Sequence, residues 1–301
     1  MLGELEQYPF FPREKICNDI LYICKEQNID IICTQEDVLI ESNNGIVPEF
    51  KELYESYDYF CIVEDILCDS HSKTINNIHK NKQPKLGNVI YVKSHLKKMV
   101  GPIKKPDEKL PACIAQMCLT HITIANIHLC GGRFDDEIVF KDSDFFKTKL
   151  ESIESLGNSI ICGDFNATRL LNKPGGLKNM NYPYELAKKY NSSFSPEQIV
   201  DVWNTWQCKP IEHFYQDWRY VSALSEQQLE IINETSSRGK TVVDWVFYNH
   251  CNIGKHDSDC IKMYASTKNT FQDITDHHMV KFEFTINDFN PCSSRRTKHI
   301  F

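Results

Sequence analysis

Short apolar segments rich in β-branched residues recur along the chain, most of them bounded by Gly, Asn, Ser or charged residues. Segments of this length and composition are typical of buried strands, because an amphipathic helix needs a longer run with apolar residues on one face. In "NSIICGDFNATR" (158–169), for example, the apolar residues 160–162 follow "NS" and precede a glycine. The predicted strands cover residues 29–34, 59–67, 87–93, 112–119, 121–129, 159–166, 241–248 and 277–286.

Helical spacing appears between some of these strands, for example where Cys17, Leu21 and Cys24 recur at intervals of three to four residues. Helices are predicted over residues 14–28, 48–57 and 142–156. Residues 167–240 are predicted to be mostly irregular, with a short helix or strand near 197–206. Because strands and helices alternate without strict βαβ order, the pattern predicts an α/β (α+β) sandwich with mixed sheets.

Domain organisation follows from the absence of repeats, low-complexity linkers and abrupt changes in composition along the 301 residues. The chain is therefore predicted to form a single domain, 1–301. Residues 70–86 are polar and lysine-rich without periodicity, which indicates a loop, and residues 287–301 form a basic C-terminal tail.

The composition is that of an ordinary soluble globular protein, with 41% hydrophobic and 25% charged residues. No apolar run is long enough to span a bilayer, and the first residues lack the pattern of a signal peptide. The 13 cysteines are an odd number and lie within predicted strands and helices, which favours unpaired thiols in a reducing compartment. We therefore expect a cytoplasmic protein, with the nucleus as the alternative. The net charge of -7 means that a nucleic-acid substrate would need a local basic patch or a metal ion.

Asp164 and Asn166 follow a predicted strand directly, and period-two geometry directs both side chains to the same side. Two interpretations are open. Asp and Asn are typical turn residues, because they hydrogen-bond their own backbone. Alternatively, they belong to an active site at the end of the strand.

Similar polar residues stand at the ends of several other predicted strands. Each is weak support alone, because a single Glu or His after a strand is usually structural. Together they supply hard oxygen ligands, which suit Mg²⁺, and histidines that can receive an anion. These are the parts of a metal-assisted phosphate ester hydrolase. The residues concerned are Glu36, Asn126, His128, Asp164, Asn166, Asp244, Asp276 and His277.

The segments "TQE", "NIHL", "GDFN", "DWVF" and "TDHHMV", in this order, resemble the endonuclease/exonuclease/phosphatase superfamily over about residues 14–286. The resemblance implies a DNase-like, four-layered sandwich in which two mixed sheets pack face to face with helices outside. It also implies a Mg²⁺ cofactor, for which Mn²⁺ can substitute.

The same resemblance implies roles for individual residues. Glu36 would be the principal metal ligand, with Asp276 close to the metal or its waters. Asp164 would activate the attacking water, helped by Asn166.

The resemblance further implies that the histidines act on the phosphate. His277 would contact the scissile phosphate and be oriented by Asp244, and His128 would stabilise the phosphoryl transition state.

Four residues are candidates for substrate binding: Asn126, Arg133, Arg238 and Lys240. A guanidinium matches phosphate geometry, but Arg133 could equally pair with a neighbouring Asp.

The sequence thus predicts a Mg²⁺-dependent phosphoesterase that hydrolyses a phosphodiester, with nucleic acid as the favoured partner and no protein partner required. Phosphoinositide, sphingolipid or nucleotide-conjugate substrates are the alternative within the class. A non-catalytic binding module is the alternative from another class. This alternative is motivated by a departure from the superfamily's pattern, in which an apolar strand ending in Asn precedes the first helix. The N-terminal residues of this chain contain no such strand.

Overall fold

The computed structural model describes residues 22–41, 45–46, 58–61, 85–101, 113–119, 122–128, 160–189, 191–235, 241–267 and 270–287, with side chains for part of them. The helices predicted over 48–57 and 142–156 lie outside these ranges, as does the region before residue 22, where the sequence shows no apolar strand.

The first sheet has four described strands in the order β2-β1-β4-β3, and all of its described pairings are antiparallel. Its central strand β1 is longer than the sequence predicted, and its register against β4 shifts between Thr34 and Asp37. The strands are β1 (Ile31–Glu41), β2 (Gly45–Ile46), β3 (Asp58–Cys61) and β4 (Lys85–Val92).

The second sheet has five strands in the order β5-β6-β7-β9-β8. It is mixed, because β6 and β7 are parallel while the other neighbours are antiparallel. The strands are β5 (Cys113–Leu119), β6 (Ile122–His128), β7 (Ile160–Asp164), β8 (Tyr220–Ser222) and β9 (Asp244–Asn249).

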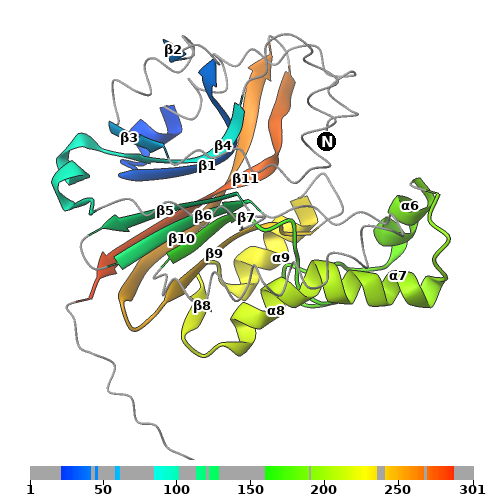
Figure 1. The fold of residues 1–301 in the computed structure, drawn as a ribbon. Helices are drawn as coiled ribbons and strands as arrows, with labels where there is room; N and C mark the ends of the chain where they lie inside the picture. The colour runs from blue at the N-terminus through cyan, green and yellow to red at the C-terminus, as the bar shows by residue number, and fades with distance from the viewer. Residues whose placement is uncertain are drawn as a thin grey trace, which may run out of the picture.

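A long antiparallel hairpin of β10 (Ile253–Thr267) and β11 (Thr270–Ile286) completes the β-structure (Figure 1). Phe282 and Phe284 of β11 pack against the core between the two larger sheets. The strand β10 was not predicted, because "GKHDSDC" is too polar to read as a strand. Its partner β11 begins before the predicted segment 277–286.

The two faces of the five-stranded sheet bury different residues, as the period-two geometry of strands requires. Ile124, Ile160 and Val246 lie in the core between the sheets, together with Ile90 and Val92 of β4. Their sequence neighbours on the opposite face pack against helices. The strand runs are nearly continuously apolar because both faces of the sheet are covered.

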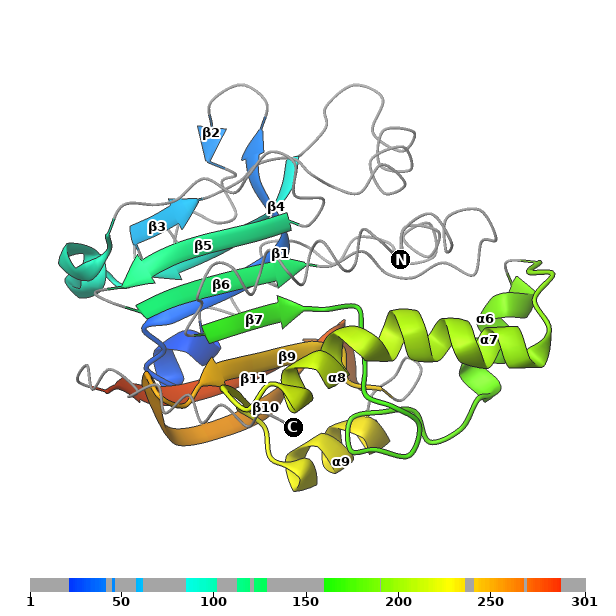
Figure 2. The same ribbon diagram turned by 60° about the horizontal axis from the view of Figure 1, so that its bottom comes forward.

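Helices α8 (Lys209–Gln216) and α9 (Glu226–Thr235) cover that outer face (Figure 2). Helices α6 (Asn181–Lys189) and α7 (Pro196–Val202) extend to one side, and the π-helix η3 (Trp203–Cys208) joins α7 to α8. These helices correct the prediction that 167–240 is mostly irregular. No helix among the described residues is long and apolar enough to cross a membrane.

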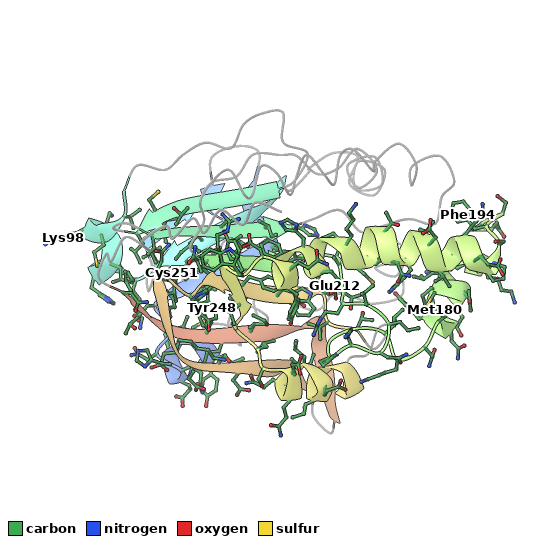
Figure 3. All side chains as sticks on the ribbon, turned by 90° about the horizontal axis from the view of Figure 1, so that it is seen from below. Lys98, Met180, Phe194, Glu212, Tyr248 and Cys251 are labelled. Atoms are coloured by element: carbon green, nitrogen blue, oxygen red, sulfur yellow. The ribbon has the colours of Figure 1, made fainter. Side chains whose placement is uncertain are left out.

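The extension formed by α6 and α7 has a small core of its own. Leu177, Ile199 and Trp203 are buried in it, and Met180 and Phe194 pack against it at the far end of the extension (Figure 3). A 3-10 helix, η2 (Ser94–Met99), follows β4.

The predicted α/β class with mixed β-structure and outer helices is confirmed, and the four-layered detail is confirmed in part. The described helices α8 and α9 supply the outer layer on the five-stranded sheet. One boundary needs correction, because residues 85–86 of the loop predicted over 70–86 belong to β4. Of the predicted tail 287–301 only Asn287 is described, so the tail stays a prediction. The backbone N–H of Asn287 donates to the carbonyl of Asn252.

Gly163 of β7 lies beside Ile127 of β6, and its φ of +132° is strained for any residue with a side chain. A Cβ here would stand 2.0 Å from the carbonyl oxygen of Ile127. We expect Gly163→Ala to lower the free energy of unfolding by about 3 kcal/mol or more, measured by urea denaturation. The matched control is Gly101→Ala, where the nearest atom, Cβ of Cys118, is 3.4 Å away. Equal stability of the two variants would contradict this account.

Candidate active site

Three of the predicted polar residues lie in one row across the five-stranded sheet. His128 of β6 is the register partner of Asp164 in β7, and Asp164 is the partner of Asp244 in β9. Because alternate residues of a strand share a face, each of the three lies on the same face as residues of the core between the sheets. Asp164, for example, shares the face of Ile160. The row therefore lies at the rim of the inter-sheet face, where β6 and β7 end and β9 begins (Figure 2).

The "GDFN" segment forms a turn and also presents its polar residues to this row. Oδ1 of Asp164 accepts a hydrogen bond from the backbone N–H of Asn166 at 2.6 Å, and Oδ2 accepts one from Nδ2 of Asn166 at 3.2 Å. Asn166 has a left-handed φ of 44°, which Asn tolerates well. The two interpretations of the sequence are thus compatible, because the turn is what fixes Asn166 against the carboxylate.

Phe165 explains why a large apolar residue separates the two polar ones. Its side chain is fully buried on the helix-covered face, in edge contact with Phe214 of α8 and Phe247 of β9. Its backbone N–H donates to the carbonyl of Val243 at 3.0 Å. Phe165 therefore anchors the turn from the side opposite to Asp164.

Burial strengthens the electrostatic interaction at the centre of the row. Nε2 of His128 lies 3.7 Å from Oδ2 of Asp164, and the two residues are only 8% and 4% exposed. The pair therefore brings an imidazole ring and a carboxylate side by side at the centre of the row.

Asn126 ties the two sheets together beside the row. It is fully buried, its Nδ2 donates to the carbonyl of Thr34 at 2.8 Å, and its Oδ1 accepts from Nε2 of Gln35 at 2.5 Å. These contacts bring the backbone of Glu36, the next residue of β1, to the same region. Sequence reasoning did not identify Gln35 as a site residue, and the proposed contact of Asn126 with substrate stays a prediction.

Replacing Asn126 with Ala is expected to lower the free energy of unfolding by about 1–3 kcal/mol, because it leaves hydrogen-bonding groups of β1 without their partner. Gln35→Ala removes only one of the two hydrogen bonds and should cost less. Urea denaturation of both variants measures this. An unchanged stability of Asn126→Ala would show that the tie between the sheets contributes nothing.

Arg169 is a second residue that sequence reasoning missed. It is 7% exposed, with Nε 3.4 Å from Oε1 of Glu212 and NH1 3.6 Å from Oε1 of Glu226. Its guanidinium carbon lies 3.8 Å from the ring centroid of Tyr215, whose pKa is raised by burial and partly lowered again by Arg169. Oε1 of Glu212, on α8 (Figure 3), also accepts from the backbone N–H of Leu170. This network fixes the segment that follows Asn166 to the helical layer.

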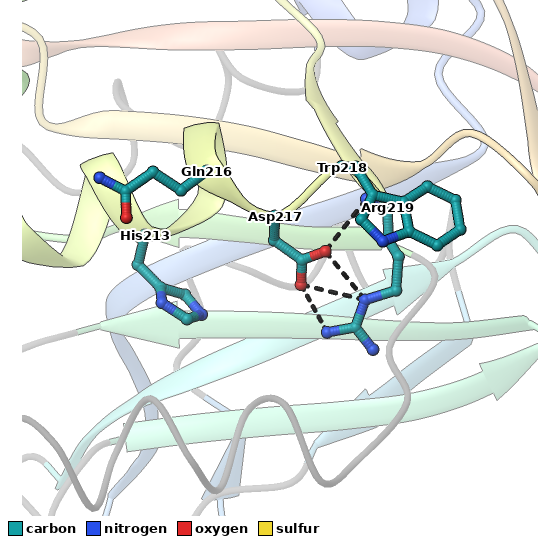
Figure 4. Close-up of a pocket in the computed structure, with 5 residues that line it drawn as sticks. All are labelled: His213, Gln216, Asp217, Trp218 and Arg219. Carbon is teal, nitrogen blue, oxygen red and sulfur yellow. Dashed lines mark hydrogen bonds and ion pairs between the residues drawn. The ribbon is translucent and has the colours of Figure 1, made fainter. Parts of the chain in front are cut away.

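A hollow of about 480 Å³ lies elsewhere, at the end of α8, and is lined by His213, Gln216, Asp217, Trp218 and Arg219 (Figure 4). The backbone carbonyl of Arg219 accepts from the N–H of His250, just after β9 ends. His250 lies at the opposite end of β9 from Asp244, and α8 covers the face of the sheet opposite to the row. The hollow is therefore not part of the candidate active site.

The remaining predicted residues are described in part or not at all. Glu36 lies in β1, and Asp276 and His277 lie in β11 within the register shift against β10, but their side chains are outside the described residues. Arg133, Arg238 and Lys240 lie outside the described residues entirely. Within the described part, no group of three or more His, Cys, Asp or Glu side chains could hold a metal ion. The predicted metal ligands are thus those whose side chains are not described.

The chain is similar to proteins of known structure. Neither a family profile nor a curated protein sequence matches the chain. The catalytic domain of human nocturnin, solved with a bound sulfate anion, superposes with a TM-score of 0.52 at 13% identity, over 95% of this chain and 89% of that domain. An AP endonuclease from Archaeoglobus fulgidus also gives a TM-score of 0.52, at 12% identity, over 90% of this chain and 95% of its own. The chain therefore has the fold of the endonuclease/exonuclease/phosphatase superfamily.

Proposed function

We propose that the chain is a Mg²⁺-dependent phosphoesterase that hydrolyses a phosphodiester in nucleic acid. The observation that supports this most directly is the row of His128, Asp164 and Asp244 at the strand ends, in which His128 and Asp164 are buried and Asn166 is hydrogen-bonded to Asp164. These residue types suit proton transfer and the stabilisation of an anion.

In this proposal Asp164 takes a proton from the attacking water, and Asn166 holds the same water through its amide. Both side chains are already fixed to one another, so little reorganisation is needed when the water arrives. His128, which lies beside Asp164, donates to the phosphoryl oxygens that gain charge in the transition state. Asp244 holds His277 in the orientation that contacts the scissile phosphate.

The metal belongs to the proposal because the predicted donors are hard oxygens, which Mg²⁺ prefers. Glu36 would hold it as principal ligand, with Asp276 close to the metal or its waters. When bound, Mg²⁺ would act as a Lewis acid on the phosphoryl oxygens. The tie between Asn126 and β1 supports this assignment, since it brings the backbone beside Glu36 close to the row.

The choice of nucleic acid is supported by one of the similar structures reported above, which is named an AP endonuclease. We propose an intracellular setting for this activity, as the cysteine usage predicts.

A substrate panel tests the proposal. The chain is incubated with Mg²⁺ and abasic duplex DNA, single-stranded DNA, RNA and soluble phosphoinositides. Cleavage of one or more nucleic acids is expected. Release of phosphate from phosphoinositides alone would show that the substrate is a phosphoinositide and not a nucleic acid. No product from any member of the panel with Mg²⁺ or Mn²⁺ would favour a non-catalytic binding module.

A further inference from the structure

An exposed indole stands at the wall of the hollow at the end of α8. Trp218 is 70% exposed, the largest exposed fraction among the large hydrophobic side chains that the structure describes. Trp203 and Trp245, by contrast, are buried. Tryptophan is highly buried on average because its ring has a large apolar area. Aromatic side chains that line a hollow are typical contacts of ligands, so Trp218 is a candidate for such a contact.

The turn that carries Trp218 is fixed by hydrogen bonds on both sides of it. The backbone N–H of Asp217 donates to the carbonyl of His213 at 3.0 Å, and the N–H of Tyr220 donates to the carbonyl of Asp217 at 3.0 Å. The side chain of Tyr220 is buried in the core under α8. The exposure of the indole therefore belongs to an ordered turn that is closed at both ends.

The indole ring also has a defined neighbour. Its centroid lies 6.2 Å from that of the His250 ring, with 67° between the ring planes. Nδ1 of His250 lies 3.1 Å from the carbonyl oxygen of Arg219, and it is the donor because a carbonyl oxygen only accepts. The imidazole is thus held in place beside the indole. Since Trp218 keeps its high exposure with this contact formed, most of its surface remains accessible to a second ring.

A positive charge lies next to the indole. Nε of Arg219 donates to Oδ1 and Oδ2 of Asp217 at 2.9 and 3.0 Å, and NH2 donates to Oδ2. In Figure 4 the carboxylate of Asp217 lies between His213 and Arg219. The side chain of Asp217 is 12% exposed and that of Arg219 is 45% exposed, so the pair presents mainly its cation to solvent. A guanidinium matches the geometry of phosphate, which favours an anionic group on the ligand.

We propose that this hollow is a binding site for an unpaired nucleotide, with the base stacked on Trp218 and the phosphate at Arg219. The two residues are consecutive, so their Cα atoms lie about 3.8 Å apart, and both line the same hollow. Its volume of about 480 Å³ is within the roughly 300–1,000 Å³ of ligand pockets. A neutral sugar could also stack on the indole, but both carboxylate oxygens of Asp217 already accept from Arg219.

The site is separate from the candidate active site, which lies at the opposite end of β9 and on the opposite face of the sheet. A nucleotide bound in the hollow is therefore not placed for cleavage. The same chemistry, one base and one phosphate, is offered by a free mononucleotide and by an unpaired nucleotide of a longer strand. Because binding here needs neither turnover nor a metal ion, the inference goes beyond the proposed function and does not rest on it.

The experiment measures binding to the full chain in EDTA by isothermal titration calorimetry, with dAMP, deoxyadenosine and a short single strand of deoxyadenylate. Binding of dAMP should quench the fluorescence of the exposed indole. Trp218→Ala should remove this quenching and weaken dAMP binding by about tenfold or more, the scale of base–aromatic stacking. Trp218→Phe keeps an aromatic face and should retain most of the affinity. Tyr184→Ala, which removes an exposed aromatic side chain on α6, is the matched control and should bind like the wild type.

A second variant tests the contact with phosphate. The wild type should bind dAMP more tightly than deoxyadenosine by about tenfold, because hydrogen bonds to charged groups are strong. In Arg219→Gln the two affinities should become nearly equal, with melting temperatures confirming that the variants fold. This ratio compares two ligands on one variant, so a general loss of stability does not change it.

The two sources of the nucleotide give different results. Tighter binding of the strand than of dAMP, lost in Trp218→Ala, would identify the strand, and equal affinities would identify the free nucleotide. Three outcomes would overturn the site: binding that is unchanged in both Trp218→Ala and Arg219→Gln, no binding of dAMP or the strand at millimolar concentration, or binding of glucose through Trp218 in place of dAMP. A chain that binds dAMP through Trp218 but cleaves no member of the substrate panel would contradict the proposed function alone.

Discussion

Asp164→Asn is expected to lower turnover by about two to four powers of ten while the chain stays folded. The substitution keeps the size of the side chain and an oxygen that accepts from the backbone N–H of Asn166, but removes the charge beside His128 and the proton acceptor. Loss of the second hydrogen bond should cost about 1–2 kcal/mol of folding free energy. Turnover and urea denaturation are measured on the same samples.

The partner substitution tests whether the two residues share one task. Asn166→Gly suits the left-handed backbone better than Ala, and it should reduce turnover less than Asp164→Asn. The double variant should be little worse than Asp164→Asn alone, because residues that act as a unit are not additive. Asp201→Asn, an exposed residue on α7, is the control and should be neutral. A loss of stability with full turnover in Asp164→Asn would mean that the segment is only a turn.

Removal of divalent metal is the second large effect that we predict. Excess EDTA should reduce turnover about a thousandfold or more, because a Lewis acid contributes several kcal/mol to the transition state. Glu36→Gln should leave the fold intact and raise the Mg²⁺ concentration for half-maximal turnover by at least about tenfold, since it removes a charged ligand. A Mg²⁺ titration of turnover measures both changes.

Glu283→Gln is the control for the metal titration, because Glu283 is exposed on β11. Its half-maximal Mg²⁺ concentration should equal that of the wild type. Full turnover in EDTA would contradict the metal assignment. An unchanged half-maximal Mg²⁺ concentration in Glu36→Gln would show that Glu36 is not a metal ligand.

The strands around the site were predictable because each is buried on both faces. In β6 and β7 the alternate residues Ile127 and Ile161 face the helices, while Ile124 and Ile160 face the other sheet. Burial on both sides leaves a continuous apolar run that stands out from the flanking sequence.

Near α7 the sequence predicted a short helix or strand, but α6, α8 and α9 were missed because the apolar face of each is narrow. In α9, Leu229 and Ile232 are the buried hydrophobic residues within a polar segment. A local signal was nevertheless present. Ser195 and Gln198 bond reciprocally at the start of α7, and Ser225 and Gln228 do so at the start of α9. These are capping boxes, which mark helix starts in a sequence.

The site was predictable to different degrees. His128, Asp164 and Asp244 end or begin recognisable strands, so their alignment follows once the strands pair in register. Gln35 and Arg169 acquire their roles through contacts with residues distant in sequence, Asn126 and Glu212. No local pattern specifies such contacts, because they depend on how the sheets and α8 pack.

The most direct test of the central claim is the fate of solvent oxygen during cleavage of the best substrate in the panel. The reaction is run with Mg²⁺ in ¹⁸O-labelled water, and the products are analysed by mass spectrometry. If Asp164 activates a water that attacks phosphorus, one labelled oxygen should appear in the phosphate group of the product, at a rate that Asp164→Asn lowers as predicted above. A product phosphate without the label, or an unchanged rate of labelling in Asp164→Asn, would contradict the account.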